Sequence, residues 1–256
     1  MTKLVATNLS LSYEVPGKGL GGMVMERLHS RRGAHAPRPK TIMALKDLNL
    51  TLRDGDRLAL LGLNGAGKTT LLKVMAGIYE PTKGSLSVDG KVAPLFDVGL
   101  GMDGDMTGRQ NLIARGLFLG LTRREIAALE QEIIDFTGLA AYIDYPVNTY
   151  SAGMYIRLAF AVVTALTPEI LLMDEGIGVG DAEFREKAHL RMDAFLRRAG
   201  ILVLSSHDFG LVREYCDQAL VLHEGSPLFH GPVEDGINFL ENFVQERHLT
   251  QIRATE

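Results

Sequence analysis

The chain contains almost no cysteine. Its 256 residues include one cysteine, Cys216, and no tryptophan. A single cysteine excludes an intrachain disulfide and is typical of proteins in a reducing compartment. Such a cysteine most often serves as a small buried apolar side chain, and we expect that role for Cys216.

Long apolar runs and a large excess of one charge are also missing. The nearest candidate for a membrane-spanning helix, Leu158–Leu166, is shorter than the roughly 18 residues that such a helix needs. The N-terminal residues Met1–Leu4 lack the apolar core of a signal peptide. The net charge of −4 gives no electrostatic sign of nucleic-acid binding. We therefore expect a cytoplasmic protein that reaches a membrane only through a partner subunit.

The most informative segment is Gly62–Thr70, which reads Gly-Leu-Asn-Gly-Ala-Gly-Lys-Thr-Thr. It matches the phosphate-binding pattern G-x-x-x-x-G-K-[ST] and lies between a predicted strand, Arg57–Leu61, and a predicted helix, Lys68–Ala76. Glycines let backbone N–H groups approach phosphate oxygens, and the helix N-terminus adds a partial positive charge. A chance match in such a chain is on the order of one in a hundred. The motif in this context predicts nucleotide binding.

Two residues of this loop have specific expected roles. Lys68 should reach the β- and γ-phosphates of ATP, and the Thr69 hydroxyl should ligate Mg²⁺. The other loop residues that we expect around the phosphates are Gly62, Asn64, Gly65, Ala66, Gly67 and Thr70.

Two adjacent carboxylates follow a predicted buried strand. Ile170–Met173 leads directly into Asp174 and Glu175, and charges at the end of an apolar strand are costly unless they have partners or a function. Alone, the pair would more often be an ordinary loop. Together with a phosphate loop, Asp174 is expected to hold Mg²⁺ and Glu175 to act as general base on the attacking water.

A histidine follows another predicted buried strand. Ile201–Leu204 leads into Ser-Ser-His207. A lone histidine in such a place is more often structural, but open α/β sheets bind ligands at the carboxyl ends of their strands. We therefore expect His207 to contact the γ-phosphate and to help hold the attacking water in line.

The remaining pattern alternates strands and helices, which predicts an α/β fold with a mostly parallel sheet covered by helices. The further predicted strands are Lys3–Ser12, Ala44–Leu52, Ser85–Val88, Val92–Phe96 and Ala219–Leu222. The further predicted helices are Arg109–Leu139, interrupted by Gly116, Gly120 and Gly138; Ser151–Thr164, ended by Pro168; and Ala182–Arg198, stopped near Gly200.

One segment departs from this alternation. Val15–Lys40 is rich in glycine, proline, arginine and histidine and is predicted to be a loop or insertion. A short helix is possible over Leu20–Arg32. The segment is locally basic, and the simplest explanation for such a charge cluster is a solvated loop. Arg27, Arg31, Arg32, Arg38 and Lys40 contribute to this basic character.

The order of motifs resembles the ATP-binding subunit of an ABC transporter over nearly the whole chain. The phosphate loop is followed by a signature at Tyr150–Met154, then Asp174-Glu175, then Asp181, then His207. This resemblance implies a P-loop NTPase with a mostly parallel core sheet, an antiparallel β subdomain and a helical subdomain at about 100–165.

The resemblance also implies roles that the residues alone do not require. From its position, Ser151 is predicted to be a helix N-cap. In the family, Ser151 and Gly153 would bind the γ-phosphate held by a second copy of the chain, so that two ATP molecules are sandwiched in a head-to-tail dimer. Asp181 would link the two sites, and Tyr13 would stack on adenine, although a tyrosine at a strand end is often only structural.

The chain departs from the family pattern at two motifs. The common signature Leu-Ser-Gly-Gly-Gln is replaced by Tyr-Ser-Ala-Gly-Met. The stretch Ala93–Gly99 matches the family's glutamine loop but has no glutamine. Asp97 occupies that position and is a candidate Mg²⁺ ligand in its place.

These departures are similar to the exporters of bacterial surface polysaccharides such as O-antigen, capsule and teichoic acid. The likeness is carried by Tyr150–Ala161, Gly178–Asp181, Thr107–Asn111 and the insertion before Ala44–Asp47. It implies an integral membrane permease as partner, a lipid-linked glycan as cargo carried by the permease, and a peripheral location on the cytoplasmic face of the inner membrane. In such exporters the insertion lies near the membrane partner, so Leu20–Arg32 is a hypothetical contact with that subunit or with the anionic headgroup of the cargo.

The expected organisation is one ATPase domain over residues 1–256. It has an insertion at 15–40, a short C-terminal extension at 226–256 and no carbohydrate-binding domain. Two alternatives remain: an exporter of another cargo such as a lipid or drug, and a soluble ABC-type ATPase that acts on DNA or ribosomes. The second is disfavoured, because the chain has one set of motifs and no long coiled coil between them. We expect no nucleic-acid partner.

Overall fold

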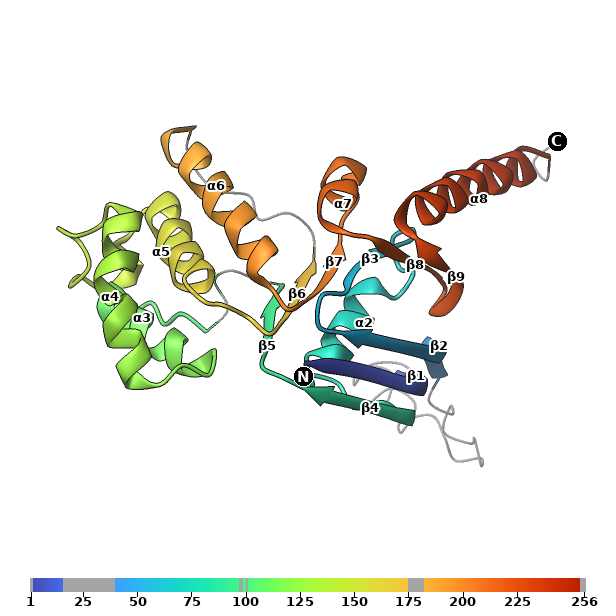
Figure 1. Ribbon diagram of the computed structural model, residues 1–256, viewed down its shortest axis with the longest axis horizontal. Coiled ribbons are helices and arrows are strands. Elements are labelled where there is room, and N and C mark those ends of the chain that lie inside the picture. Colours follow the sequence, from blue (N-terminus) through green and yellow to red (C-terminus); the bar gives the residue numbers. More distant parts are fainter. Residues whose placement is uncertain (1, 16–39, 97–98, 100, 175–181, 254–256) are drawn as a thin grey trace, which may run out of the picture.

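The computed structural model describes residues 2–15, 40–96, 99, 101–174 and 182–253 (Figure 1). Within them the chain forms two sheets. One has three strands in the order β2-β1-β4, and the other has six in the order β5-β6-β7-β3-β8-β9. The predicted α/β fold with a largely parallel core sheet is therefore present.

The six-stranded sheet is parallel except at one edge. Neighbouring strands from β5 to β8 run in the same direction, and only β9 is antiparallel to β8. Short apolar strands of this kind are buried on both faces, and β7 is buried along its whole length. The strands are β5 (Val92–Leu95), β6 (Ile170–Asp174), β7 (Ile201–Ser205), β3 (Arg57–Leu61), β8 (Gln218–His223) and β9 (Ser226–Pro232).

Register places the polar strand ends at one edge of this sheet. Asp174, the last residue of β6, lies opposite Ser205, the last residue of β7. Ser205 in turn lies opposite Leu60 of β3, two residues before the phosphate loop begins. The predicted phosphate, metal and histidine positions thus follow strands that end side by side, as expected for ligand sites in open α/β sheets.

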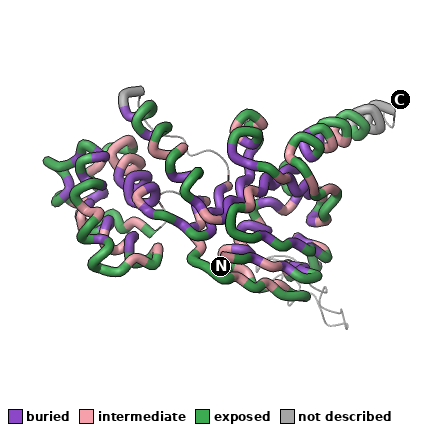
Figure 2. Tube along the Cα trace, viewed as in Figure 1, coloured by how far each residue is buried: buried purple, intermediate pink, exposed green. Residues whose placement is uncertain are grey.

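The smaller sheet consists of β1 (Lys3–Val15), β2 (Lys40–Arg53) and β4 (Lys83–Asp89), all antiparallel. Alternate leucines of β1 and β2 are buried against α2 (Lys68–Met75), so α2 is packed between the two sheets. The other face of the larger sheet is covered by α6 (Ala182–Arg198), α7 (Phe209–Tyr215) and α8 (Val233–Arg253). Figure 2 shows buried residues running along the sheet between these layers.

A separate group of helices lies at one end of the molecule (Figure 1). It contains α3 (Gly108–Phe118), α4 (Arg123–Thr137), the short 3₁₀ helix Val147–Thr149 and α5 (Ala152–Thr164). Capping boxes at Thr107 and Thr122 satisfy the first N–H groups of α3 and α4. The group has its own apolar core around Phe160, whose ring stacks on Phe136 and meets Phe184 of α6 edge to face.

The structure corrects several predicted boundaries. Gly116 was expected to interrupt the helix but lies within α3. A glycine is needed at this position, because a Cβ atom there would lie 2.7 Å from the Ile126 side chain. The end of α5 at Thr164, by contrast, agrees with the prediction. β1 and β2 extend further than predicted and pair to their ends, Val15 opposite Lys40. The intervening insertion, including Leu20–Arg32, lies outside the described residues.

Four of the described elements were missed altogether: the 3₁₀ helix Val147–Thr149, α7, β9 and α8. For α7 a signal was present, because Asp208 caps the helix by accepting hydrogen bonds from the N–H groups of Gly210 and Leu211. Cys216, which follows α7, is buried as expected, and burial raises the pKa of its thiol to about 12. Among the described residues, no helix is both long and apolar enough to cross a bilayer.

Candidate functional site

The predicted phosphate loop joins β3 to α2 as a tight turn with an open helix N-terminus. Gly67 is the N-cap of α2 with φ 106°, and it provides no side-chain cap. The first N–H groups of α2 are therefore left to other acceptors. Together with the partial positive charge of the helix end, this makes the turn chemically suited to an anion.

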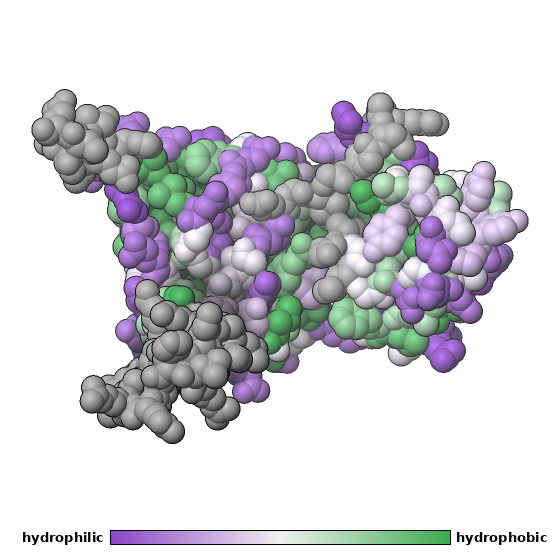
Figure 3. All heavy atoms as spheres, turned by 180° about the vertical axis from the view of Figure 1, so that it is seen from behind, coloured by the Kyte–Doolittle hydropathy of each residue, from purple (hydrophilic) through white to green (hydrophobic). Residues whose placement is uncertain are grey.

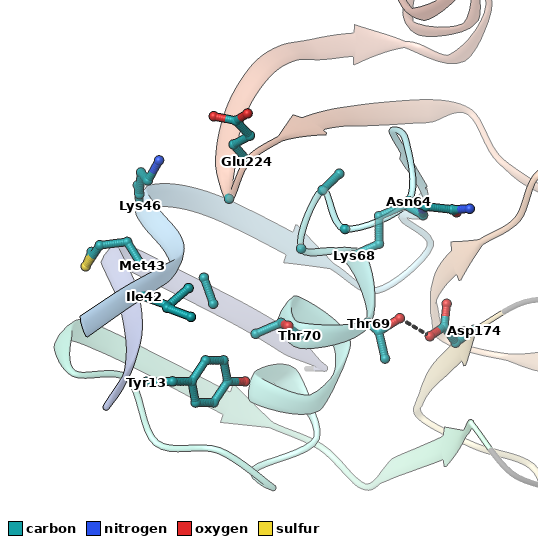
Figure 4. A pocket seen from close by; sticks show the side chains of 15 residues that line it. Tyr13, Ile42, Met43, Lys46, Asn64, Lys68, Thr69, Thr70, Asp174 and Glu224 are labelled. Carbon is teal, nitrogen blue, oxygen red and sulfur yellow. Dashed lines mark hydrogen bonds between the residues drawn. The ribbon is translucent and has the colours of Figure 1, made fainter. Parts of the chain in front are cut away.

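Lys68 points into the loop that precedes it (Figure 4). The side chain is 8% exposed, and its Nζ donates hydrogen bonds to the carbonyl oxygens of Gly62 at 2.7 Å and Leu63 at 3.3 Å. A buried ammonium is stable only when it is hydrogen-bonded. The two carbonyls hold the charge within the loop, where it faces the position expected for phosphate oxygens.

Thr69 of α2 and Asp174 of β6 are in direct contact. The Thr69 hydroxyl donates a hydrogen bond of 2.5 Å to Oδ2 of Asp174 (Figure 4). Residues 105 positions apart in the sequence thus bring together a hydroxyl and a carboxylate, the hard oxygen donors that Mg²⁺ prefers. The described residues hold no cluster of three or more acidic, histidine or cysteine side chains suited to a metal.

A cavity of about 500 Å³ opens beside these residues, a volume typical of small-molecule sites. The phosphate loop and Asp174 form one end, and Tyr13 of β1 lies at the other (Figure 4). Burial raises the pKa of the Tyr13 hydroxyl, and the Tyr13 ring meets that of Tyr79 edge to face at 5.7 Å. Exposed Ile42 and Met43 of β2 add apolar wall beside Tyr13, so this end suits a flat aromatic base.

The third wall of the cavity is the β8–β9 turn, which the sequence prediction missed. Glu224 and Gly225 line the cavity together with Ala44 and Lys46 of β2. The Gly225 N–H donates to the Ala66 carbonyl at 2.9 Å, and the Gly225 carbonyl accepts from the Lys46 N–H at 2.8 Å. The turn therefore ties the phosphate loop to β2. A Glu-Gly pair directly after a predicted strand was the available signal for this turn.

His207 does not line the nucleotide cavity. It follows β7, is exposed, and lines an adjoining groove beside Gly62, Leu63 and Asn64 of the phosphate loop. Asn64, Gly65, Ala66, Gly67, Lys68, Thr69 and Thr70 all line the cavity, and Gly62 lines the groove. Asp97, Glu175 and Asp181 lie outside the described residues.

Ser151 and Gly153 lie at the start of α5, in the helical group and away from this cavity (Figure 1). The Ser151 hydroxyl accepts a hydrogen bond from the Met154 N–H at 3.2 Å, which makes it the N-cap of α5. Tyr150, the first unusual residue of the signature, is held by its hydroxyl, which donates to the Tyr142 carbonyl at 2.8 Å. Burial raises the pKa of this hydroxyl. No residue of α5 lines the cavity of its own chain.

Gly62 shows how tightly the loop is built. It has φ +144°, and a side chain there would place Cβ 2.3 Å from the Leu222 carbonyl oxygen of β8. We expect Gly62→Ala to lower the free energy of unfolding by about 3 kcal/mol. Gly65→Ala is a matched control, because Gly65 has φ +78° but open space at Cβ. It should cost about 1 kcal/mol through backbone strain alone. Denaturant unfolding without nucleotide measures both, and equal losses would contradict the close approach to β8.

The comparisons with known proteins agree with this geometry. A sequence model of the ABC transporter family matches residues 45–178. The chain is 43% identical over 201 residues to the O-antigen export system ATP-binding protein RfbB of Myxococcus xanthus, covering 78% of this chain and 46% of that protein. It is 38% identical over 229 residues to RfbE, the O-antigen export system ATP-binding protein of Yersinia enterocolitica, covering 88% and 96%. It is 35% identical to the teichoic acids export ATP-binding protein TagH of Lactococcus lactis, covering 83% and 46%.

The chain thus spans about half the length of two of these relatives and nearly all of the third. Among solved structures, the fold matches a dimeric ATP-binding cassette bound to ADP and phosphate, with a TM-score of 0.64 and 19% identity over 90% of this chain and 98% of that one. It also matches an ATP-binding subunit of an ABC transporter, with a TM-score of 0.65 and 23% identity over 91% and 90%. At these identities the structures establish the fold alone.

Proposed function

The chain belongs to the ABC transporter family, and on that premise we propose that it is the ATP-hydrolysing subunit of an exporter of lipid-linked surface polysaccharide. The observation that carries the ATPase part is the cavity between Tyr13 and the Thr69–Asp174 pair. One end suits a base, and the other presents a lysine, a hydroxyl, a carboxylate and an open helix N-terminus. A nucleoside triphosphate needs such an arrangement.

At the phosphate end each residue has a distinct part. Lys68, already aimed into its loop, offers its ammonium to the β- and γ-phosphates. Thr69 and Asp174 fit Mg²⁺ as oxygen ligands, and Asp97 is a further candidate ligand. Bound Mg²⁺ would offset the negative charge that builds up during phosphoryl transfer. Backbone N–H groups of Gly65 to Thr70 orient the triphosphate.

The reaction needs a base on the attacking water, and we assign that role to Glu175. In the sequence, Glu175 directly follows Asp174, the last residue of β6. His207 follows the neighbouring strand, β7, and lines the adjoining groove together with Asn64. From there it can contact the γ-phosphate. Tyr13 stacks on adenine at the opposite end.

The site is completed by a second copy of the chain. Ser151 and Gly153 lie at the N-terminus of α5, which carries a partial positive charge, yet α5 contributes nothing to the cavity of its own chain. In a head-to-tail dimer each signature binds the γ-phosphate of the other copy, and Asp181 links the two sites. The existence of a dimeric cassette with this fold supports this arrangement.

The cargo and the membrane partner are proposed from the named relatives. Two are O-antigen export proteins and one a teichoic acids export protein, and all are ATP-binding components. We infer that this chain docks on an integral membrane permease at the cytoplasmic face of the inner membrane. The permease carries the lipid-linked glycan, and the closing and opening of the ATP dimer drives it.

Removal of the gene in its own host tests this function. Surface polysaccharide should disappear, and lipid-linked glycan should accumulate on the cytoplasmic side. The unmodified gene and Lys73→Ala, which changes a lysine of α2 outside the cavity, should restore export, while Lys68→Ala should not. Intact surface polysaccharide with failed export of another lipid or a drug would assign a different cargo.

A further inference from the structure

A groove runs between α8 and the phosphate loop on the side away from Tyr13. One part, about 640 Å³, is lined by Leu63, His207, Phe209, Val244 and Gln245 among others. A second part, about 400 Å³, is lined by Leu63 to Ala66, the His223–Glu224 pair, Val244 and Arg247. Asn64, Gly65, Ala66 and Glu224 also line the nucleotide cavity. The phosphate loop therefore separates the cavity that contains Tyr13 from the α8 groove.

α8 is firmly seated where it borders this groove. Ile237 is fully buried and Leu240 is 8% exposed, and both pack on the sheet. The Phe239 ring stacks on Phe229 of β9 at 5.6 Å. Further along, Nη1 of Arg247 lies 3.0 Å from Nε2 of His223 in β8. The helix is thus held to the domain as far as Arg247.

The groove has the composition of a protein contact surface. Its apolar floor is formed by Leu63, which is 38% exposed although it belongs to the phosphate loop, and by half-buried Phe209 and Val244. Its rim is polar and exposed, with Gln245 and Arg247 on α8 and His207 opposite. An apolar centre with a polar rim is the usual anatomy of an interface between proteins. Seen from behind, apolar side chains lie on the surface beside the described part of α8, at upper left (Figure 3).

We propose that this groove is a contact surface for a second copy of the chain in the ATP-bound dimer, in addition to the signature contact. The inference rests on the proposed function, which requires a second copy to cover the γ-phosphate. His207, which is expected to contact that phosphate, and Asn64 of the phosphate loop both line the groove. A subunit that covers them also covers the mouth of the groove, so the α8 surface continues the ATP interface.

Two substitutions of α8 test this surface. Val244→Glu places a charge on the floor of the groove, where burial by another subunit would leave it unpaired. We expect it to raise the dissociation constant of the dimer formed with a non-hydrolysable ATP analogue by roughly tenfold or more. Asn242→Glu adds the same charge to an exposed residue of α8 that lines neither part of the groove, and should change the constant less than about twofold. Fluorescent-nucleotide affinity of the monomer should be unchanged in both.

Accessibility gives a second readout that does not depend on tolerance of a charge. Maleimide labelling of Gln245→Cys should slow by roughly tenfold when the analogue is added, while Asn242→Cys labels at the same rate. The natural Cys216 adds little background, because it is buried and its thiol pKa is raised to about 12. Protection must vanish on dilution below the dimer dissociation constant, because a second copy provides it.

The outcomes separate this inference from the proposed function. If the unmodified chain forms no dimer with the analogue, both are overturned. If it dimerises, but Val244→Glu and Gln245→Cys behave like the Asn242 controls, only the α8 contact is overturned. Protection of Gln245→Cys that survives dilution also overturns it, since the cover would then come from the same chain.

Discussion

Lys68→Ala should weaken ATP binding by roughly a hundredfold or more while leaving the chain folded. The Lys68 ammonium is buried in the loop and already donates hydrogen bonds to the Gly62 and Leu63 carbonyls. Charge-assisted hydrogen bonds to phosphate are about twice as strong as neutral ones, and one ammonium can serve both phosphates and carbonyls. Its removal leaves the triphosphate facing two carbonyl oxygens with no cation between them.

Equilibrium binding of a fluorescent ATP analogue measures this effect, and circular dichroism reports folding. Lys73→Ala is the matched control: it removes a lysine from the same helix, five residues on, outside the cavity. It should leave the ATP dissociation constant within about twofold of the unmodified value. Normal affinity of Lys68→Ala, or equal losses in both variants, would overturn the assignment of the phosphate site.

The parts of the site that could be predicted depend on local sequence. β3 was predicted with its observed boundaries, Arg57–Leu61, because a continuous apolar run followed by a glycine-rich turn fixes both ends. The family and the α/β fold class, inferred from the motif order, are confirmed. Thr69 and Asp174, which were each expected at Mg²⁺ from their motifs, are in direct contact.

The parts that escaped prediction depend on tertiary contacts. β9 is a half-exposed edge strand with Pro227 and Pro232, so it lacks a clear apolar alternation. Gly236 weakens the helical pattern of α8, yet it is needed there because a side chain would meet Ala219 at 2.5 Å. Only the packing of α8 on β8 shows that it borders the phosphate loop. The sequence pattern of α8 alone does not indicate that neighbour.

Glu175→Gln should bind ATP normally but hydrolyse it roughly 10²–10⁴-fold more slowly, and should accumulate as an ATP-bound dimer. Glutamine keeps the shape and hydrogen-bonding capacity of the side chain but cannot take a proton from the attacking water. Asp174, which precedes it and accepts the Thr69 hydrogen bond, is unchanged, so the phosphate and metal end of the site should remain intact. Glu175→Gln should therefore impair ATP hydrolysis but not ATP binding, whereas Lys68→Ala should impair ATP binding itself.

Single-turnover hydrolysis and size-exclusion chromatography with Mg-ATP measure the two halves of this prediction. Glu186→Gln is the matched control, since it makes the same change at an exposed position of α6 outside the cavity. It should turn over normally and return to monomer as ATP is consumed. Slow hydrolysis by Glu175→Gln without a persistent dimer would support the base but refute the second copy. Normal hydrolysis would instead show that another group, with His207 the nearest candidate, takes the proton.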